Sequence, residues 1–153
     1  MVPGMGTDVL IRRAQANDAE AVANVFLASR ATMTYLPQLH TEADTRAFIA
    51  RVVNELETFV ALDNGNVAGF MALRNDWLDH LYVRPKHFSR GMGSLLLEEA
   101  KRRRPDGFQF WVFQQNERAR RFYERHGCIA AEFTDGSGNE ERLPDIRYEW
   151  RSI

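Results

Sequence analysis

This sequence contains one cysteine, no long apolar run and almost no net charge. Its single cysteine, Cys128, cannot close an intramolecular disulfide, so we expect a cytoplasmic, reducing location. No stretch approaches the roughly 18 to 20 apolar residues that cross a bilayer, and we expect no membrane association. The start, MVPGMGTDV, lacks the cationic segment and apolar run of a signal peptide.

Charge of either sign is nearly balanced. Lysine and arginine total 20 against 21 aspartate and glutamate residues, which gives no bulk attraction to nucleic acid. A basic run at residues 101–104 stands where a helix is expected to end, and the helix dipole favours cations there. The four histidines and one cysteine show no recognised spacing of metal ligands. We therefore expect neither a nucleic-acid partner nor a metal.

The length of the chain predicts one domain. A chain of 153 residues with a hydrophobic fraction of 44% can build one core. Residues 1–6 carry glycine and proline and are expected to form a disordered lead, so the single domain is expected over residues 7–153. No repeat, linker or low-complexity stretch indicates a second one.

Alternation and helical spacing predict an α/β fold. The expected strands are residues 9–13, 58–62, 67–73, 77–83, 108–113, 129–133 and 146–150. The expected helices follow Asp18, follow Thr41, and cover residues 91–104 and 116–126. This order contains antiparallel hairpins and a helical crossover between parallel neighbours, so the sheet is expected to be mixed.

A glycine-bearing turn joins the expected strand at 77–83 to the helix at 91–104. The helix opens within RGMGS, from Arg90 to Ser94. Unpaired N–H groups and the positive end of the dipole face outward there, and Gly91 and Gly93 leave room for a phosphate. This predicts an anion cradle, although two glycines can also simply shape a loop. A triphosphate P-loop is excluded because no Gly-Lys-Ser/Thr follows.

The second motif is NERARRFYERHG, which begins at Asn116 and contains Tyr123. Seven residues, close to two helical turns, separate these two side chains and place them near one face. They can therefore contact one extended ligand. Taken singly, Asn116 is a helix N-cap and Tyr123 a core aromatic residue.

With these motifs, residues 9–150 resemble the GNAT superfamily of acetyl-CoA-dependent N-acetyltransferases. Residues 88–93 match the family's phosphate motif Gln/Arg-x-x-Gly-x-Gly/Ala, with Phe88 where a polar residue is usual. Residues 116–127 match Asn-x-x-Ala-x-x-Phe-Tyr-Glu-x-x-Gly position by position. Cys128 stands where that pattern usually has Phe, and we interpret it as a small buried apolar residue. The resemblance implies a mixed, mostly antiparallel seven-stranded sheet flanked by about four helices.

The resemblance also implies a reaction, direct attack of a neutral amine on the thioester of acetyl-CoA without an acyl-enzyme. It places the pantetheine arm between the splayed strands at 77–83 and 108–113, with backbone N–H groups near Val83 holding the oxyanion. Tyr123 is expected to protonate the leaving thiolate, since a phenol stays protonated at neutral pH. The expected cofactor contacts are Leu81, Tyr82, Val83, Arg90, Gly91, Met92, Gly93, Ser94, Asn116, Ala119 and Tyr123.

A base or a water chain must remove a proton from the incoming ammonium. Asp79 is the first candidate, because alternation along the strand puts it on the face of Leu81 and Val83. Relayed water and His40 are the alternatives. His80 points the other way, and a histidine in a strand that faces helices is typical of a hydrogen-bonded structural residue.

The acceptor is expected to contact the irregular apolar loop between the first two helices. The expected substrate contacts are Met33, Tyr35, Leu36, Leu39 and His40, which can also simply plug the end of the sheet. Our leading hypothesis is an N-acetyltransferase for a small-molecule amine or amino acid. A protein or peptide N-acetyltransferase and a catalytically silent CoA-binding sensor are the alternatives, and family habit suggests a homodimer.

Overall fold

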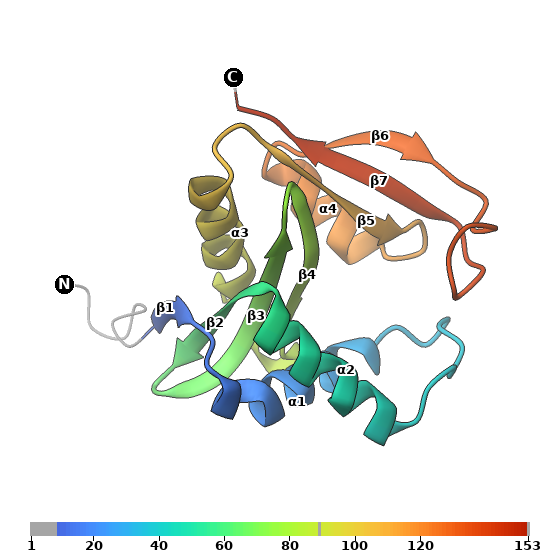
Figure 1. Ribbon diagram of the computed structural model, residues 1–153. Helices are drawn as coiled ribbons and strands as arrows, with labels where there is room; N and C mark the ends of the chain where they lie inside the picture. The colour runs from blue at the N-terminus through green and yellow to red at the C-terminus, as the bar shows by residue number, and fades with distance from the viewer. Residues whose placement is uncertain (1–8, 89, 153) are drawn as a thin grey trace.

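The computed structural model describes residues 9–88 and 90–152, and the expected disordered lead at 1–6 lies outside them. Seven strands and four α-helices follow in the order expected from the sequence (Figure 1). The strands are β1 Val9–Arg13, β2 Glu57–Asp63, β3 Asn66–Arg74, β4 Trp77–Val83, β5 Phe108–Phe113, β6 Ile129–Phe133 and β7 Asp145–Trp150. The helices are α1 Ala19–Arg30, α2 Glu42–Glu55, α3 Met92–Arg103 and α4 Glu117–Arg125, with two 3-10 turns, η1 Ala16–Asp18 and η2 Pro85–His87.

All seven strands form one mixed sheet with the order β1-β2-β3-β4-β5-β7-β6. Every neighbouring pair is antiparallel except β4 and β5, which are parallel. Apolar residues of α1 and α2 form one buried cluster with the sheet, and those of α3 form another with β4, β5 and Tyr123 of α4. The predicted sheet class is confirmed, and the helices divide the core between two faces.

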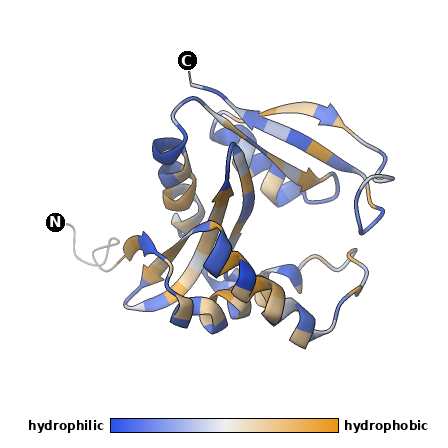
Figure 2. Cartoon of the chain, viewed as in Figure 1, coloured by the Kyte–Doolittle hydropathy of each residue, from blue (hydrophilic) through white to orange (hydrophobic). Residues whose placement is uncertain are grey.

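The basic run at the end of α3 is matched by acidic side chains. Figure 2 shows this end of the helix as a hydrophilic segment. The guanidinium of Arg103 donates to Glu99 (2.8 Å) and that of Arg104 to Glu57 (2.9 Å). Lys101 lies 3.3 Å from Glu98. These cations are therefore held by carboxylates of the same molecule.

Strands β4 and β5 diverge after one bridged residue pair. Trp77 pairs with Gln109, and the next residues of the two strands are not paired. At this point the indole rings of Trp77 and Trp111 stack with centroids 6.4 Å apart. Beyond it, the inner edges of β4 and β5 keep backbone N–H and C=O groups that no sheet neighbour uses. The expected splay is present.

A β-bulge interrupts the alternation of β4 at Asp79. On β3, Ala72 is opposite His80 and Leu73 is opposite Leu78, so Asp79 is the extra residue. Leu78 consequently packs in the same cluster as Val83, although it lies five positions before Val83 and strict alternation would place the two on opposite faces. Strict alternation, from which the sequence placed Asp79 on the Leu81 and Val83 face, therefore does not hold through this residue.

Gly69 of β3 allows β4 and α3 to approach closely. A Cβ at this position would lie 2.9 Å from the carbonyl oxygen of Tyr82 and 3.2 Å from the side chains of Leu96 and Val83. We expect Gly69→Ala to lower the free energy of unfolding by about 1–3 kcal/mol, because a backbone oxygen cannot move aside easily. Urea denaturation followed by tryptophan fluorescence measures this change.

The matched control is Gly138→Ala. A Cβ there meets no atom within 4 Å, and its backbone is not in the left-handed region. We expect a change within about 0.5 kcal/mol. Equal stabilities of the two variants would contradict the packing assigned to Gly69.

Candidate active site

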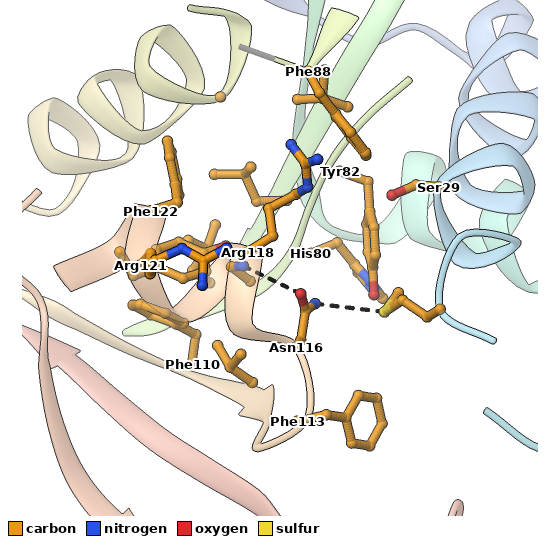
Figure 3. A pocket seen from close by; sticks show the side chains of 18 of the residues that line it. Ser29, His80, Tyr82, Phe88, Phe110, Phe113, Asn116, Arg118, Arg121 and Phe122 are labelled. Atoms are coloured by element: carbon orange, nitrogen blue, oxygen red, sulfur yellow. Dashed lines mark hydrogen bonds between the residues drawn. The ribbon is translucent and has the colours of Figure 1, made fainter. Parts of the chain in front are cut away.

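A cavity of about 720 Å³ opens between the splayed strands. Its wall is formed by α1, β4, β5, the start of α3 and one side of α4, as the close view in Figure 3 shows. This volume falls within the usual range for a small-molecule site. Segments that are far apart in the sequence therefore meet where β4 and β5 separate.

The start of α3 faces this cavity without a side-chain cap. Gly91 is the N-cap residue with a left-handed φ of +82°, and no side-chain cap hydrogen bond forms there among the described residues. In contrast, Thr41 caps α2 and Asn116 caps α4. Gly91, Gly93 and Ser94 all line the cavity. The first N–H groups of α3 are therefore available to an anion, which fits the predicted cradle.

Gly93 also brings α4 close to this cradle. A Cβ at Gly93 would lie 3.2 Å from the ring of Phe122 on α4. The two segments are joined further by Ser94, whose Oγ lies 3.0 Å from Nε2 of His126. The glycine thus sets the distance between the cradle and the helix that carries Tyr123.

Three arginines of α4 line the same end of the cavity. Arg118, Arg121 and Arg125 recur at intervals of three and four residues and so share one helix face. The guanidinium of Arg118 lies 4.4 Å from the ring centroid of Phe88. Phe88, which stands where the family pattern usually has a polar residue, therefore orients the guanidinium of Arg118. Sequence reasoning missed Arg125, although its spacing from Arg118 was visible.

Tyr123 forms part of the cavity wall. Its side chain is 7% exposed, and its ring centroid is 4.3 Å from that of Phe110 on β5. Its hydroxyl makes no hydrogen bond to another described residue, and burial raises the pKa of the phenol. The hydroxyl is therefore protonated at neutral pH and can donate to a ligand.

Asn116 lies in the same wall and joins α4 to the loop after α1. Its Oδ1 accepts the N–H of Ala119 (3.2 Å), and its Nδ2 lies 3.5 Å from Sδ of Met33 (Figure 3). The N-cap interpretation is thus correct, and Asn116 also reaches the cavity that Tyr123 reaches. The structure brings the two ends of the second motif together.

The predicted cofactor contacts separate into two groups. Those that line the cavity are Leu81, Tyr82, Val83, Gly91, Gly93, Ser94, Asn116, Ala119 and Tyr123. Arg90 and Met92 lie outside its wall; Arg90 is exposed and Met92 is 2% exposed in the core. Any role of these two residues is therefore limited to their backbone or to packing in this structure.

Asp79 lines the cavity while both of its carboxylate oxygens are engaged. Nε of Arg74 donates to Oδ2 at 2.7 Å and Nη2 donates to Oδ1 at 3.2 Å. This fork fixes the orientation of the carboxylate. Asp79 can accept a substrate proton only through lone pairs that Arg74 does not use.

His80 also lines the cavity, from within a group of aromatic rings. Its ring centroid lies 5.7 Å from that of Phe48 and 6.1 Å from that of Phe26. Burial lowers the pKa of His80 to about 4, so the imidazole is neutral. Its Nδ1 is buried and has no partner among the described residues, so the interpretation of a hydrogen-bonded histidine is wrong.

Only part of the predicted acceptor loop reaches the cavity. Met33 is in the wall, together with Ser29, Thr32 and Phe113, which the sequence did not single out. Four of the predicted substrate contacts lie outside the wall, namely Tyr35, Leu36, Leu39 and His40. The loop is instead tied to the β6–β7 connection at residues 134–144.

Two side-chain contacts to carboxylates make this connection. Nε2 of His40 lies 2.6 Å from Glu140, and Nη2 of Arg30 lies 3.5 Å from Glu141. Tyr35 packs inside the loop, with its ring centroid 6.2 Å from that of Phe113, and burial raises the pKa of its phenol to about 12. These contacts hold the loop against the β6–β7 connection, and Thr32 and Met33 of the loop form part of the cavity wall.

Cys128 is buried at 4% exposure, and burial raises the pKa of its thiol to about 12. This agrees with its interpretation as an apolar residue, since little thiolate forms.

In the described ranges, 9–88 and 90–152, no helix is long and apolar enough to cross a membrane. The same residues contain no group of three or more potential metal ligands.

Comparisons with known proteins agree with this geometry. Residues 54–127 match a family model described as an acetyltransferase (GNAT) domain. No curated protein matches the chain. The matched segment runs from the end of α2 to the end of α4 and so includes both sequence motifs.

Solved structures share the whole fold. YjaB of Escherichia coli, in its apo form, is 22% identical, with a TM-score of 0.78 over 95% of this chain and 99% of that chain. A GCN5-related N-acetyltransferase of Rhodopseudomonas palustris is 24% identical, with a TM-score of 0.78 over 96% and 97%. The PaiA N-acetyltransferase of Thermoplasma acidophilum, in complex with coenzyme A, is 21% identical, with a TM-score of 0.71 over 94% and 98%.

The lowered pKa of His80 makes stability depend on pH. An ordinary histidine takes up a proton near pH 6.5, whereas His80 in the folded protein does so only near 4. The stability associated with the neutral ring is complete above 6.5 and is lost as the pH falls from 6.5 to 4. The expected loss is up to about 1.4 kcal/mol per pH unit.

Urea denaturation of the wild-type protein and the His80→Gln variant across this window measures the effect. The variant should lose less stability on acidification, because its side chain cannot titrate. Equal losses in the two proteins would contradict the assignment to His80.

Proposed function

We propose that this chain, a member of the GNAT acetyltransferase superfamily, transfers an acetyl group from acetyl-CoA to the amine of a small molecule or amino acid. The observation that carries the proposal is the position of Tyr123. Its side chain is 7% exposed and lies in the wall of the cavity where β4 and β5 diverge, as does the start of α3. A proton donor and an anion cradle thus serve one cavity.

The residues of the cradle fit the diphosphate of coenzyme A. The N–H groups at the start of α3 can bind its oxygens, and Arg118, Arg121 and Arg125 supply positive charge at the same end. The free backbone edge at Leu81 and Val83 suits a pantetheine arm, which carries amide groups. The similar Thermoplasma acidophilum protein is described in complex with coenzyme A, which supports this choice.

The wall residues can carry out transfer in one displacement. A neutral amine forms a C–N bond with the thioester carbonyl carbon as the C–S bond breaks. The backbone N–H groups near the end of β4 stabilise the negative charge on the carbonyl oxygen. Tyr123 donates its proton to the departing thiolate, and Asp79 or a relayed water accepts the proton of the amine.

The contacts of the loop after α1 favour a small acceptor over a peptide. The His40–Glu140 and Arg30–Glu141 contacts tie this loop and the end of α1 to the β6–β7 connection. A peptide would need an open groove there. A silent CoA-binding sensor is disfavoured, because pure binding gains little from an acid placed in the cavity. A cytoplasmic location and a homodimer also remain part of the proposal.

Replacing Tyr123 with Phe tests the assigned acid. We expect kcat to fall about 10²–10⁴-fold, because the leaving thiolate loses its proton donor. Coenzyme A affinity, measured by calorimetry, should change little. The rate is followed as release of free thiol from acetyl-CoA with a panel of amines.

Tyr148→Phe is the matched control. The hydroxyl of Tyr148 donates to Glu124 at 2.6 Å and lies outside the cavity wall. This variant should lose about 1–3 kcal/mol of stability and keep its turnover. Full turnover by Tyr123→Phe would refute the acid assignment.

The base is tested by the pH dependence of kcat/KM. If Asp79 accepts the amine proton, Asp79→Asn removes the acidic limb of the profile and lowers the rate about 10²-fold or more. His80→Gln should keep that limb. Asp76→Asn, which lies outside the cavity wall, is the control and should behave as the wild type. Loss of the limb in His80→Gln alone would transfer the role to His80.

A further inference from the structure

The cavity has a second half, away from the cradle, whose chemistry differs from that of the arginine-lined end. We call it the acceptor half, and this name rests on the proposed function. Figure 3 shows it beside α1, opposite Arg118, Arg121 and Phe122. We assign to it Ser29, Thr32, Met33, Asp79, His80, Tyr82, Trp111, Phe113 and Asn116, all of which line the cavity.

Aromatic faces dominate the acceptor half, and their neighbours hold them in place. The ring of Tyr82 stacks on Phe70 with centroids 5.8 Å apart and meets Phe26 edge-on at 5.0 Å. Phe113 is held by Tyr35 in the same edge-on manner. Rings fixed in this way lose little conformational entropy when a ligand binds. The acceptor half therefore offers preformed surfaces to an apolar group.

Among the residues assigned to the acceptor half, Asp79 alone carries a charge, and Arg74 pairs with its carboxylate at 2.7 Å. Arg30, which lies outside the wall, is paired with Glu141 at 3.5 Å. His80 is neutral because it is buried. A second charge on the acceptor would thus lie in the cavity without a partner, which is unfavourable.

The polar groups of the acceptor half suit one nitrogen. The hydroxyl of Thr32 already donates to the carbonyl of Ser29 at 2.6 Å. Nδ2 of Asn116 has only the weak acceptor Sδ of Met33, 3.5 Å away, whereas Nδ1 of His80 is buried and does not reach the cavity surface. These few neutral groups can orient an amine but cannot balance a carboxylate or a second ammonium.

We propose that the acceptor is an arylalkylamine, a primary amine on a short apolar chain that ends in an aromatic ring and carries no second charge. The ring packs among Tyr82, Trp111 and Phe113. The thioether of Met33 adds a sulfur–aromatic contact. The amine points from this half toward the thioester beside Tyr123.

A matched set of acceptors tests this class. With acetyl-CoA, free thiol release is measured for 2-phenylethylamine, for phenylalanine, which adds a carboxylate, and for 1,4-diaminobutane, which replaces the ring with a second ammonium. We expect kcat/KM to be roughly tenfold or more higher for 2-phenylethylamine than for either other amine. An equal or higher value for either of them would overturn the proposal.

Variants of the wall test the location. Phe113→Ala should raise KM for 2-phenylethylamine roughly tenfold and change the affinity for coenzyme A little. Phe133→Ala, on a β6 side chain that is 60% exposed and outside the cavity, should leave both values unchanged. If Phe113→Ala fails to fold, Met33→Ala gives the same comparison. Equal KM values in wall variant and control would overturn the proposed location.

Different results would overturn the arylalkylamine assignment and the acetyltransferase function. Thiol release with phenylalanine or diaminobutane in preference to 2-phenylethylamine overturns the arylalkylamine assignment and leaves the acetyltransferase function intact. Binding of coenzyme A without thiol release for any of the three amines counts against both.

Discussion

The divergence of two parallel strands is the constraint on which the candidate site depends. After the single pair Trp77–Gln109, β4 and β5 separate, and every group assigned to chemistry lies around the opening. A fully paired sheet would bury the edge of β4 and leave Tyr123 facing packed side chains. The rest of the fold holds these edges apart. It also gives the opening one end lined by arginines and another lined mostly by aromatic residues.

The two ends are built by different means. At the charged end, a helix start without a cap and the missing side chain at Gly93 let the backbone itself bind an anion. At the other end, the acceptor would contact mostly uncharged side chains, and the carboxylate of Asp79 there is paired with Arg74. A site made in this way can keep the same carrier while its acceptor changes through a few side chains on α1 and β5.

Much of this arrangement could be predicted from sequence, because it depends on local patterns. The hairpin around Gly65, the helix that begins at Gly91 and the spacing of Asn116 and Tyr123 all lie within short segments. The bulge at Asp79 could not be predicted, because two residues opposing one is a property of the strand pair. The environment of His80 was missed for a similar reason, since its neighbours Phe26 and Phe48 come from separate helices.

The stacked indoles of Trp77 and Trp111 stand at the apex where the strands part. Trp111 also forms part of the cavity wall and is 45% exposed. Two indole chromophores at this distance couple and produce an exciton signal in circular dichroism. The molecule thus contains an intrinsic optical reporter at the point where β4 and β5 separate, and a change in the distance between the two rings alters its signal.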